Sequence, residues 1–263
     1  MRNGDADRVL VGDDVDPIGG FVPRCARIKP DEQKPDGLEP YPYQEDAWQA
    51  LNEHLSRSET TGRLEGLLVM PTGSGKTYTA VRWLVSNHVK RGGRVLWIAH
   101  RYDPPEQVAH AFHLASFLAS GVPILQIRIV SGVHCPASAI WHEDNVIVCS
   151  IQSLSRRPEV VADLLRDENL FLVIDEAHHS TATSYRRLIE MLQPRQKRFV
   201  LGLTATPTRT VEDERPLLAK LFGQTKIYEV RFRDLVERDY LARPYPEIVK
   251  TNVAVGEGVT EAD

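Results

Sequence analysis

The segment 71–77, with the sequence Pro-Thr-Gly-Ser-Gly-Lys-Thr, contains the residue types that bind a polyphosphate. It follows the apolar run Gly66–Met70 and precedes a stretch with helical periodicity. Glycines let successive backbone N–H groups turn toward phosphate oxygens, and the positive end of a following helix adds to the attraction. Lys76 would reach the β- and γ-phosphates, and the Thr77 hydroxyl would bind Mg²⁺. Met70 stands where the strict motif has glycine, yet the pattern still favours a phosphate loop over a glycine-rich turn without a ligand.

A second chemical motif is the run 170–178, Leu-Phe-Leu-Val-Ile-Asp-Glu-Ala-His, in which an apolar strand ends in two adjacent carboxylates. Asp175 is predicted to hold Mg²⁺ through its water shell, and Glu176 to polarise the water that attacks the γ-phosphate. Adjacent acids at a strand end would also suit a helix N-cap. The phosphate loop upstream favours the catalytic interpretation.

The run Gly-Leu-Thr-Ala-Thr-Pro at 202–207 completes a set of three motifs. In this order they resemble the DEAH-type superfamily 2 helicases and translocases, and within these the branch of restriction-enzyme motor subunits and related DNA helicases. The similarity covers about Tyr41 to Pro244, and the set is highly specific. It implies a RecA-like α/β fold, a three-layer sandwich of a mostly parallel sheet with helices on both faces. It also implies ATP and Mg²⁺ as ligands.

The resemblance implies a nucleotide-binding role for further residues. Gln44 resembles the glutamine that reads the adenine edge, because a carboxamide donates and accepts hydrogen bonds at once. Tyr41 stands where the family often has arginine, so the base would stack on a ring. A surface glutamine at the start of an amphipathic helix is the alternative for Gln44. The predicted nucleotide-binding residues are Tyr41, Gln44, Thr72, Gly73, Ser74, Gly75, Lys76 and Thr77.

Two further segments resemble the family's contacts with the nucleic-acid backbone. One ends in His-Arg at 100–101, and the other is Cys-Ser-Ile-Gln-Ser-Leu at 149–154. A helix cap and a solvated charge are the alternative for the first segment. The residues implied to contact nucleic acid are His100, Arg101, Ser150, Gln152 and Ser153. The residues implied to couple the ATP state to the grip on nucleic acid are His178, Thr204 and Thr206.

These side chains must be positioned by alternating strands and helices. Several expected strands are continuous apolar runs, which indicates a mostly parallel sheet covered on both faces. Strands are expected at Gly66–Met70, Arg94–Ala99, Ile124–Val130, Asn145–Ser150, Leu170–Asp175, Arg198–Leu203 and Ile227–Val230. Helices are expected at Gln44–Ser56, Lys76–His88, Glu106–Ala119, Glu159–Arg166, Thr183–Leu192 and Pro216–Phe222.

Composition excludes several classes of protein. The chain has 263 residues, of which 42% are hydrophobic and 26% charged, so it is long and apolar enough to bury a core. The net charge of −4 excludes binding to nucleic acid through bulk positive charge. Arginine-rich stretches such as 195–198 are interpreted as solvated helix faces. No apolar run approaches the length that spans a bilayer, and the N-terminus does not resemble a signal peptide, which predicts a cytoplasmic protein. The three cysteines lack the spacing of a disulfide framework or a zinc site and are expected to be reduced and mostly buried.

The chain divides into three parts by its sequence. Residues 1–38 are expected to form an acidic, flexible extension with at most one short strand at Gly20–Ala26, and residues 39–243 the ATP-binding domain. Residues 244–263 are expected to be a linker or the start of a second motor domain. After Thr206 there is no Gln-x-x-Gly-Arg-x-x-Arg pattern, which in the family supplies arginines to ATP from the second RecA-like domain. That domain is therefore expected elsewhere in a longer native chain or in a partner chain.

Together these features predict the ATP-binding half of a nucleic-acid helicase or translocase, with DNA favoured over RNA by the resemblance. The alternative is an ATP-sensing interaction module of a defence or repair complex that has no unwinding activity.

Overall fold

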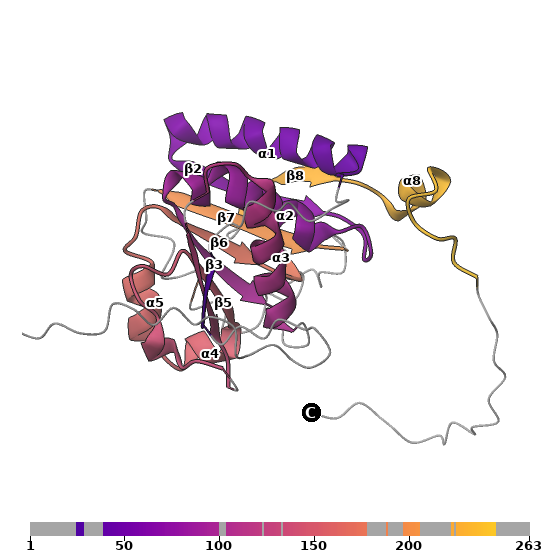
Figure 1. Cartoon of the computed structure of the whole chain (residues 1–263). Coiled ribbons are helices and arrows are strands. Elements are labelled where there is room, and N and C mark those ends of the chain that lie inside the picture. The colour runs from indigo at the N-terminus through magenta and orange to yellow at the C-terminus, as the bar shows by residue number, and fades with distance from the viewer. Residues whose placement is uncertain are drawn as a thin grey trace, which may run out of the picture.

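The structure of the protein is a computed structural model that describes residues 25–28, 39–99, 104–122, 124–132, 134–177, 188, 197–205, 222–223 and 225–245. Strand β1, at 25–28, is described by its backbone. A sheet forms the centre of the molecule and helices cover both of its faces (Figure 1). This arrangement confirms the predicted α/β class.

The sheet has eight strands in the order β1-β4-β5-β3-β6-β7-β2-β8. Strand β1 pairs antiparallel with β4, and all other neighbours are parallel. The carboxyl ends of seven strands therefore lie along one edge, where α/β proteins bind their ligands. The strands are β1 (Cys25–Ile28), β2 (Arg63–Val69), β3 (Arg94–Ala99), β4 (Leu125–Val130), β5 (Val146–Ser150), β6 (Leu170–Ile174), β7 (Arg198–Thr204) and β8 (Lys226–Glu229).

The helices form a layer on each side of the sheet. Helices α1, α2 and α3 pack against one face, and the shorter α4 and α5 cover the other (Figure 1). Within the described residues, no helix has the length and apolar character needed to cross a bilayer. The α-helices are α1 (Pro42–Thr61), α2 (Lys76–Asn87), α3 (Pro105–Leu118), α4 (Ile151–Ser155), α5 (Pro158–Leu164) and α8 (Phe232–Glu237). Short 3-10 helices lie at η1 (Val89–Arg91) and η2 (Ala137–Ala139).

The central strands are apolar on both faces because each face has its own core. In β3, Val95 and Trp97 point into the core beneath α1, α2 and α3, whereas Leu96 and Ile98 point into the core beneath α4 and α5. All five residues of β6 are buried. The continuous apolar runs in the sequence are explained by this two-sided burial.

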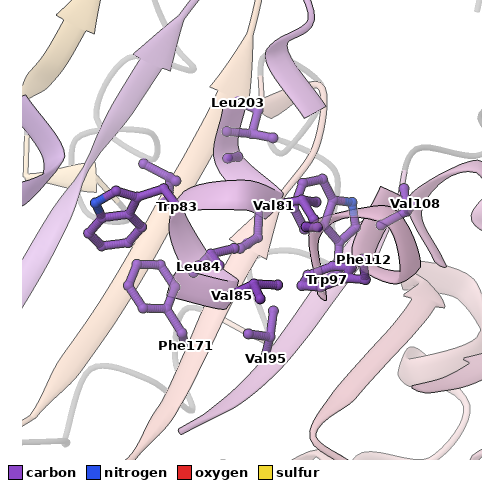
Figure 2. Packing of buried hydrophobic residues seen from close by; sticks show 14 of the residues in the cluster. Val81, Trp83, Leu84, Val85, Val95, Trp97, Val108, Phe112, Phe171 and Leu203 are labelled. Carbon is purple, nitrogen blue, oxygen red and sulfur yellow. The ribbon is translucent and has the colours of Figure 1, made fainter. Parts of the chain in front are cut away.

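Aromatic rings fix α2 and α3 on the sheet (Figure 2). The ring of Trp83 on α2 meets that of Phe171 on β6 edge to face, with 5.9 Å between centroids. Trp97 on β3 and Phe112 on α3 make the same kind of contact, also at 5.9 Å. All four rings are buried, so these contacts hold α2 against β6 and α3 against β3.

The predicted elements agree closely with the structure in the centre of the sheet and less well at some ends. Helix α1 starts two residues earlier and ends five residues later than expected, and Gly62 terminates it with a φ of +69°. The short N-terminal strand is described at Cys25–Ile28 and overlaps the expected Gly20–Ala26 at residues 25–26, whereas residues 20–24 lie outside the described residues. Helix α4 was not predicted. The helices expected at 183–192 and 216–222 fall almost entirely outside the described residues.

The strand expected to begin at Arg198 is confirmed, but the interpretation of the Arg198 side chain as part of a solvated helix face is wrong. Arg198 starts β7, and its Nε lies 2.8 Å from Oε1 of Glu65 on the adjacent strand β2. Both side chains are largely buried, and this burial raises the pKa of Glu65 although Arg198 opposes the change. The pair lies where β2 and β7 begin, and the ladder between these strands starts at Arg63 opposite Arg198, earlier than the apolar run of β2 indicates.

Two cysteine side chains are described, and both are free thiols. Cys149 is fully buried in β5, and burial raises its pKa, so it remains protonated. Cys135 is partly buried. The expectation of reduced thiols is confirmed for these two residues.

Glycine at position 202 on β7 leaves room for the side chains of Leu67 and Phe222. A Cβ at this position would lie 2.6 Å from Leu67 Cδ2 and 2.6 Å from Phe222 Cε1. We predict that Gly202→Ala lowers the free energy of unfolding by about 1–3 kcal/mol because the extra carbon overpacks the core. Gly132→Ala is the control, since a Cβ there meets nothing within 4 Å. Urea unfolding that gave equal stabilities for the two variants would contradict the packing described here.

Candidate nucleotide site

Three predicted motifs meet at the carboxyl edge of the sheet. Strand β2 leads into the phosphate loop, β6 leads into the two carboxylates, and β7 lies between these strands. Val69, the last residue of β2, pairs with Thr204, and the N–H of Met70 donates to the Thr204 carbonyl at 3.0 Å. The parallel register therefore brings together segments that are far apart in the sequence.

The phosphate loop is held by hydrogen bonds within itself. Gly73 and Gly75 have φ values of +84° and +76°, a region that favours glycine. The Ser74 hydroxyl donates to the Pro71 carbonyl at 2.7 Å, and Ser74 is almost fully buried. Helix α2 begins immediately after Gly75, so its positive end faces the loop, as the sequence predicts.

The central contact of the site joins Lys76 to Glu176. Lys76 Nζ lies 2.8 Å from Glu176 Oε1, although the two residues are 100 positions apart in the sequence. The exposed fractions of their side chains are 9% and 24%, so the contact is shielded from bulk water. The structure thus brings together the two residues predicted to be catalytic.

Asp175 shapes the turn that directs Glu176 toward the loop. Its own N–H donates to the Ile98 carbonyl at 2.9 Å, which continues the pairing beyond the end of β6. One oxygen of its buried carboxylate accepts the N–H of Glu176 at 3.0 Å. Glu176 has a φ of +45°, a conformation that costs a residue with a side chain about 1–2 kcal/mol. Strain of this size is typical of functional sites.

Gln44 ties the start of α1 to the phosphate loop. Its Oε1 accepts the N–H of Tyr41 at 3.1 Å, and its Nε2 donates to the Ser74 carbonyl at 3.1 Å. A Cβ on Gly75 would lie 2.7 Å from Gln44 Nε2. Gln44 is only 4% exposed, so the alternative of a surface glutamine is wrong. The adenine-reading role stays a prediction.

Tyr43 and Trp48 belong to the same contact region, and the sequence analysis did not assign them. The Tyr43 hydroxyl donates to the Ser74 carbonyl at 3.0 Å, and Trp48 Nε1 donates to the carbonyl of Thr79 on α2 at 2.8 Å. Burial raises the pKa of Tyr43, which keeps the hydroxyl protonated as a donor. The signal in the sequence is the spacing of four between Gln44 and Trp48, which places both on one face of α1.

A family model described as "Type III restriction enzyme, res subunit" matches residues 37–209 of the chain. The chain belongs to this family, ResIII. The match includes the phosphate loop and the carboxylates at the end of β6. This ResIII chain is a homologue of superfamily 2 helicase and translocase motor domains.

Curated proteins that are similar in sequence match this chain over only part of their own length. A 51.5 kDa protein of a Lactococcus phage (isolate 7-9) is 24% identical over 193 residues, which are 73% of this chain and 35% of the phage protein. The RNA polymerase-associated protein RapA of Actinobacillus succinogenes is 32% identical over 119 residues, or 43% of this chain and 12% of RapA. The chain therefore spans about a third or less of the length of these curated relatives.

Two solved structures of helicase and restriction-modification proteins have a similar fold. The UvsW helicase from bacteriophage T4 has a TM-score of 0.51 and 19% identity, over 75% of this chain and 62% of UvsW. A nuclease-deletion mutant of the Type ISP restriction-modification enzyme LlaGI, solved with a DNA substrate mimic, has a TM-score of 0.52 and 18% identity, over 76% of this chain and 20% of LlaGI. These likenesses confirm the predicted RecA-like fold.

The residues predicted to contact nucleic acid are only partly described in the ResIII chain. Ser150 caps the start of α4: its Oγ accepts the N–H of Ser153 at 3.2 Å and lies 2.9 Å from the Ser153 hydroxyl. Gln152 is exposed beside them, and all three lie at the carboxyl edge after β5. Thr204 is buried at the end of β7. His100, Arg101, His178 and Thr206 lie outside the described residues.

The oxygen atoms at this edge suit a hard cation such as Mg²⁺. Thr77 supplies a hydroxyl in the first turn of α2, and Asp175 supplies a buried carboxylate after β6. Among the residues that the structure describes, no three His, Cys, Asp or Glu side chains gather as a metal cage. The Thr77 hydroxyl and the Asp175 carboxylate fit Mg²⁺, which usually binds one or two carboxylates together with waters and substrate phosphates.

The double hydrogen bond of Gln44 leads to a stability prediction. We expect Gln44→Ala to lower the free energy of unfolding by about 1–3 kcal/mol without any nucleotide, because buried groups lose their partners. Gln152→Ala removes an exposed amide and serves as the control, with an expected change within about 0.5 kcal/mol. Chemical denaturation monitored by circular dichroism measures both. Similar stabilities for the two variants would show that Gln44 does not hold the loop.

Proposed function

We propose that this chain is the ATP-binding half of an ATP-dependent nucleic-acid helicase or translocase, which hydrolyses ATP with Mg²⁺ when it is paired with a second RecA-like domain. The observation that carries the proposal is the shielded contact between Lys76 and Glu176 at the mouth of the phosphate loop. A lysine that binds phosphate and a carboxylate that activates water must both lie beside the terminal phosphate of ATP.

In this proposal the phosphates of ATP lie over the loop 72–77 at the start of α2. Backbone N–H groups and the positive helix end bind the phosphate oxygens, and Lys76 moves from Glu176 to the β- and γ-phosphates. The adenine is placed near Tyr41 and Gln44, whose side chains adjoin the loop from the start of α1. Tyr41 is about half exposed and offers its ring for stacking.

Mg²⁺ would be held by Thr77 and Asp175, and when bound it would neutralise charge on the phosphate oxygens. Glu176, once released from Lys76, is the general base that orients and polarises the attacking water. Its backbone is fixed by the hydrogen bond to Asp175, so its carboxylate is held at the edge of the site.

DNA is the proposed nucleic acid. Support comes from the ResIII family itself, which is described as a restriction-enzyme subunit, and from the fold likeness to LlaGI, which was solved with a DNA substrate mimic. We place the DNA backbone along the carboxyl edge near His100, Arg101 and the Ser150–Ser153 turn. Coupling to ATP is assigned to His178, Thr204 and Thr206, because Thr204 hydrogen-bonds the residue that precedes the phosphate loop.

The proposed motor unit spans residues 39–243, preceded by an extension at 1–38. Residues 244–263 are proposed to lead toward the second RecA-like domain, in the same native chain or in a partner chain. That domain would supply the arginines that stabilise charge on the transferring phosphoryl group.

Replacing Lys76 tests the assignment of the phosphate site. We predict that Lys76→Ala weakens Mg-ATP binding at least about 10-fold, because a charged donor to the phosphates is lost. Isothermal titration calorimetry of the two chains measures the difference. Lys90→Ala is the control, since Lys90 is an exposed lysine on η1, and it should bind like the wild type. Unchanged affinity in Lys76→Ala would refute the site.

Replacing Glu176 separates binding from chemistry. Glu176→Gln removes the charge that competes for Lys76, so we expect Mg-ATP to bind as tightly as in the wild type or more tightly. The same variant loses the general base, and any hydrolysis of ATP should fall about 100-fold. Calorimetry and a steady-state phosphate-release assay give the two quantities. Hydrolysis at the wild-type rate would exclude Glu176 as the base.

A further inference from the structure

Three tyrosine rings gather at the start of α1, next to the proposed adenine position. Tyr41 and Tyr43 are stacked, with centroids 5.6 Å apart and ring planes at 11°. The third ring, Tyr240, comes from the far end of the described chain and lies 5.2 Å from Tyr41 and 5.3 Å from Tyr43. Tyr240 therefore packs against the side of the Tyr41 ring, on which adenine is proposed to stack.

The end of α8 fixes the position of Tyr240. The N–H groups of Tyr240 and Leu241 both donate to the Leu235 carbonyl, at 2.8 and 3.2 Å. Leu235 is 1% exposed and belongs to the core beneath α1, α2 and α3. Asp239, with a φ of +57°, turns the chain back toward α1. The backbone of residues 240–241 is thus fixed on the domain by hydrogen bonds to the buried Leu235.

The next residue, Leu241, lies near the phosphate loop. A Cβ placed on Gly73 would lie 3.5 Å from Leu241 Cδ2, which is ordinary van der Waals contact. Gly73 itself is exposed at the crest of the loop. Two consecutive side chains therefore lie beside the two halves of the proposed nucleotide site: Tyr240 contacts the rings of Tyr41 and Tyr43, and Leu241 lies close to Gly73 of the loop.

We propose that Tyr240 and Leu241 form an additional wall of the nucleotide site and transmit nucleotide binding to the chain that follows α8. This inference rests on the proposed ATP site. A purine on Tyr41 would fix the orientation of that ring and thereby strengthen its contact with Tyr240. Phosphates in the loop would fix Gly73 against Leu241. The segment that leaves the domain would then be held more firmly when nucleotide is bound than when the site is empty.

A comparison of two ligands isolates the contribution of Tyr240. Mg-ATP uses both the base platform and the loop, whereas Mg-tripolyphosphate uses only the loop. We expect Tyr240→Ala to weaken binding of Mg-ATP about 3- to 10-fold, since an aromatic contact contributes on the order of 1 kcal/mol. Binding of tripolyphosphate should change less than about 2-fold. Tyr240→Phe keeps the ring and should bind ATP like the wild type, as should Phe232→Ala, which alters an exposed ring elsewhere on α8.

Hydrogen exchange on the wild-type chain tests transmission without relying on any variant. Saturating Mg-ATP should slow amide exchange in 232–245 several-fold, and Tyr240→Ala should abolish this effect. Unchanged exchange in the wild type with ATP bound would overturn the inference and leave the ATP site intact. An equal loss of affinity for both ligands in Tyr240→Ala would also overturn it, because the residue would then act only on the fold. If the wild type bound neither ligand, the proposed function would fail first, and the inference with it.

Discussion

The ion pair between Lys76 and Glu176 is the interaction on which the site depends. It connects the loop after β2 to the turn after β6 across the intervening strand β7. A charge that is shielded from water raises the free energy of the folded protein when it has no partner. Lys76 and Glu176 therefore stabilise each other as long as no ligand binds Lys76 more strongly. In the proposed function, the β- and γ-phosphates of ATP are that ligand for Lys76. Binding of ATP would then free Glu176 next to the phosphate that must be attacked, and would thereby prepare the proposed base.

The strands and hydrogen bonds around the site hold Lys76 and Glu176 close together. The parallel register aligns the ends of β2 and β7, Gly202 leaves room beside β7 for the side chains of Leu67 and Phe222, and Asp175 fixes the backbone of Glu176. From the other side, Gln44 and Tyr43 both donate to the Ser74 carbonyl and hold the loop against α1. The rigid sheet and the local hydrogen bonds thus constrain both partners of the ion pair.

The sequence predicted the parts of the site that follow from local chemistry. Glycine, lysine and threonine at fixed spacing, and two carboxylates after an apolar strand, each allow few interpretations. Contacts between distant segments were not predictable, because spacing gives no information about them: Arg198 pairs with Glu65 from 133 positions away. The burial of Gln44 was not predictable for the same reason, since it depends on how α1 packs on the phosphate loop. Strand centres were predicted better than ends, because burial on both faces defines the centres and hydrogen bonding decides the ends.

The most direct test is a crystal structure of the chain with Mg²⁺ and a non-hydrolysable ATP analogue. The account predicts phosphates over the loop 72–77, with Lys76 Nζ about 3 Å from a β- or γ-phosphate oxygen and no longer paired with Glu176. It further predicts the freed Glu176 carboxylate facing the γ-phosphate. A structure in which the analogue is bound elsewhere while the Lys76–Glu176 pair stays intact would contradict the account.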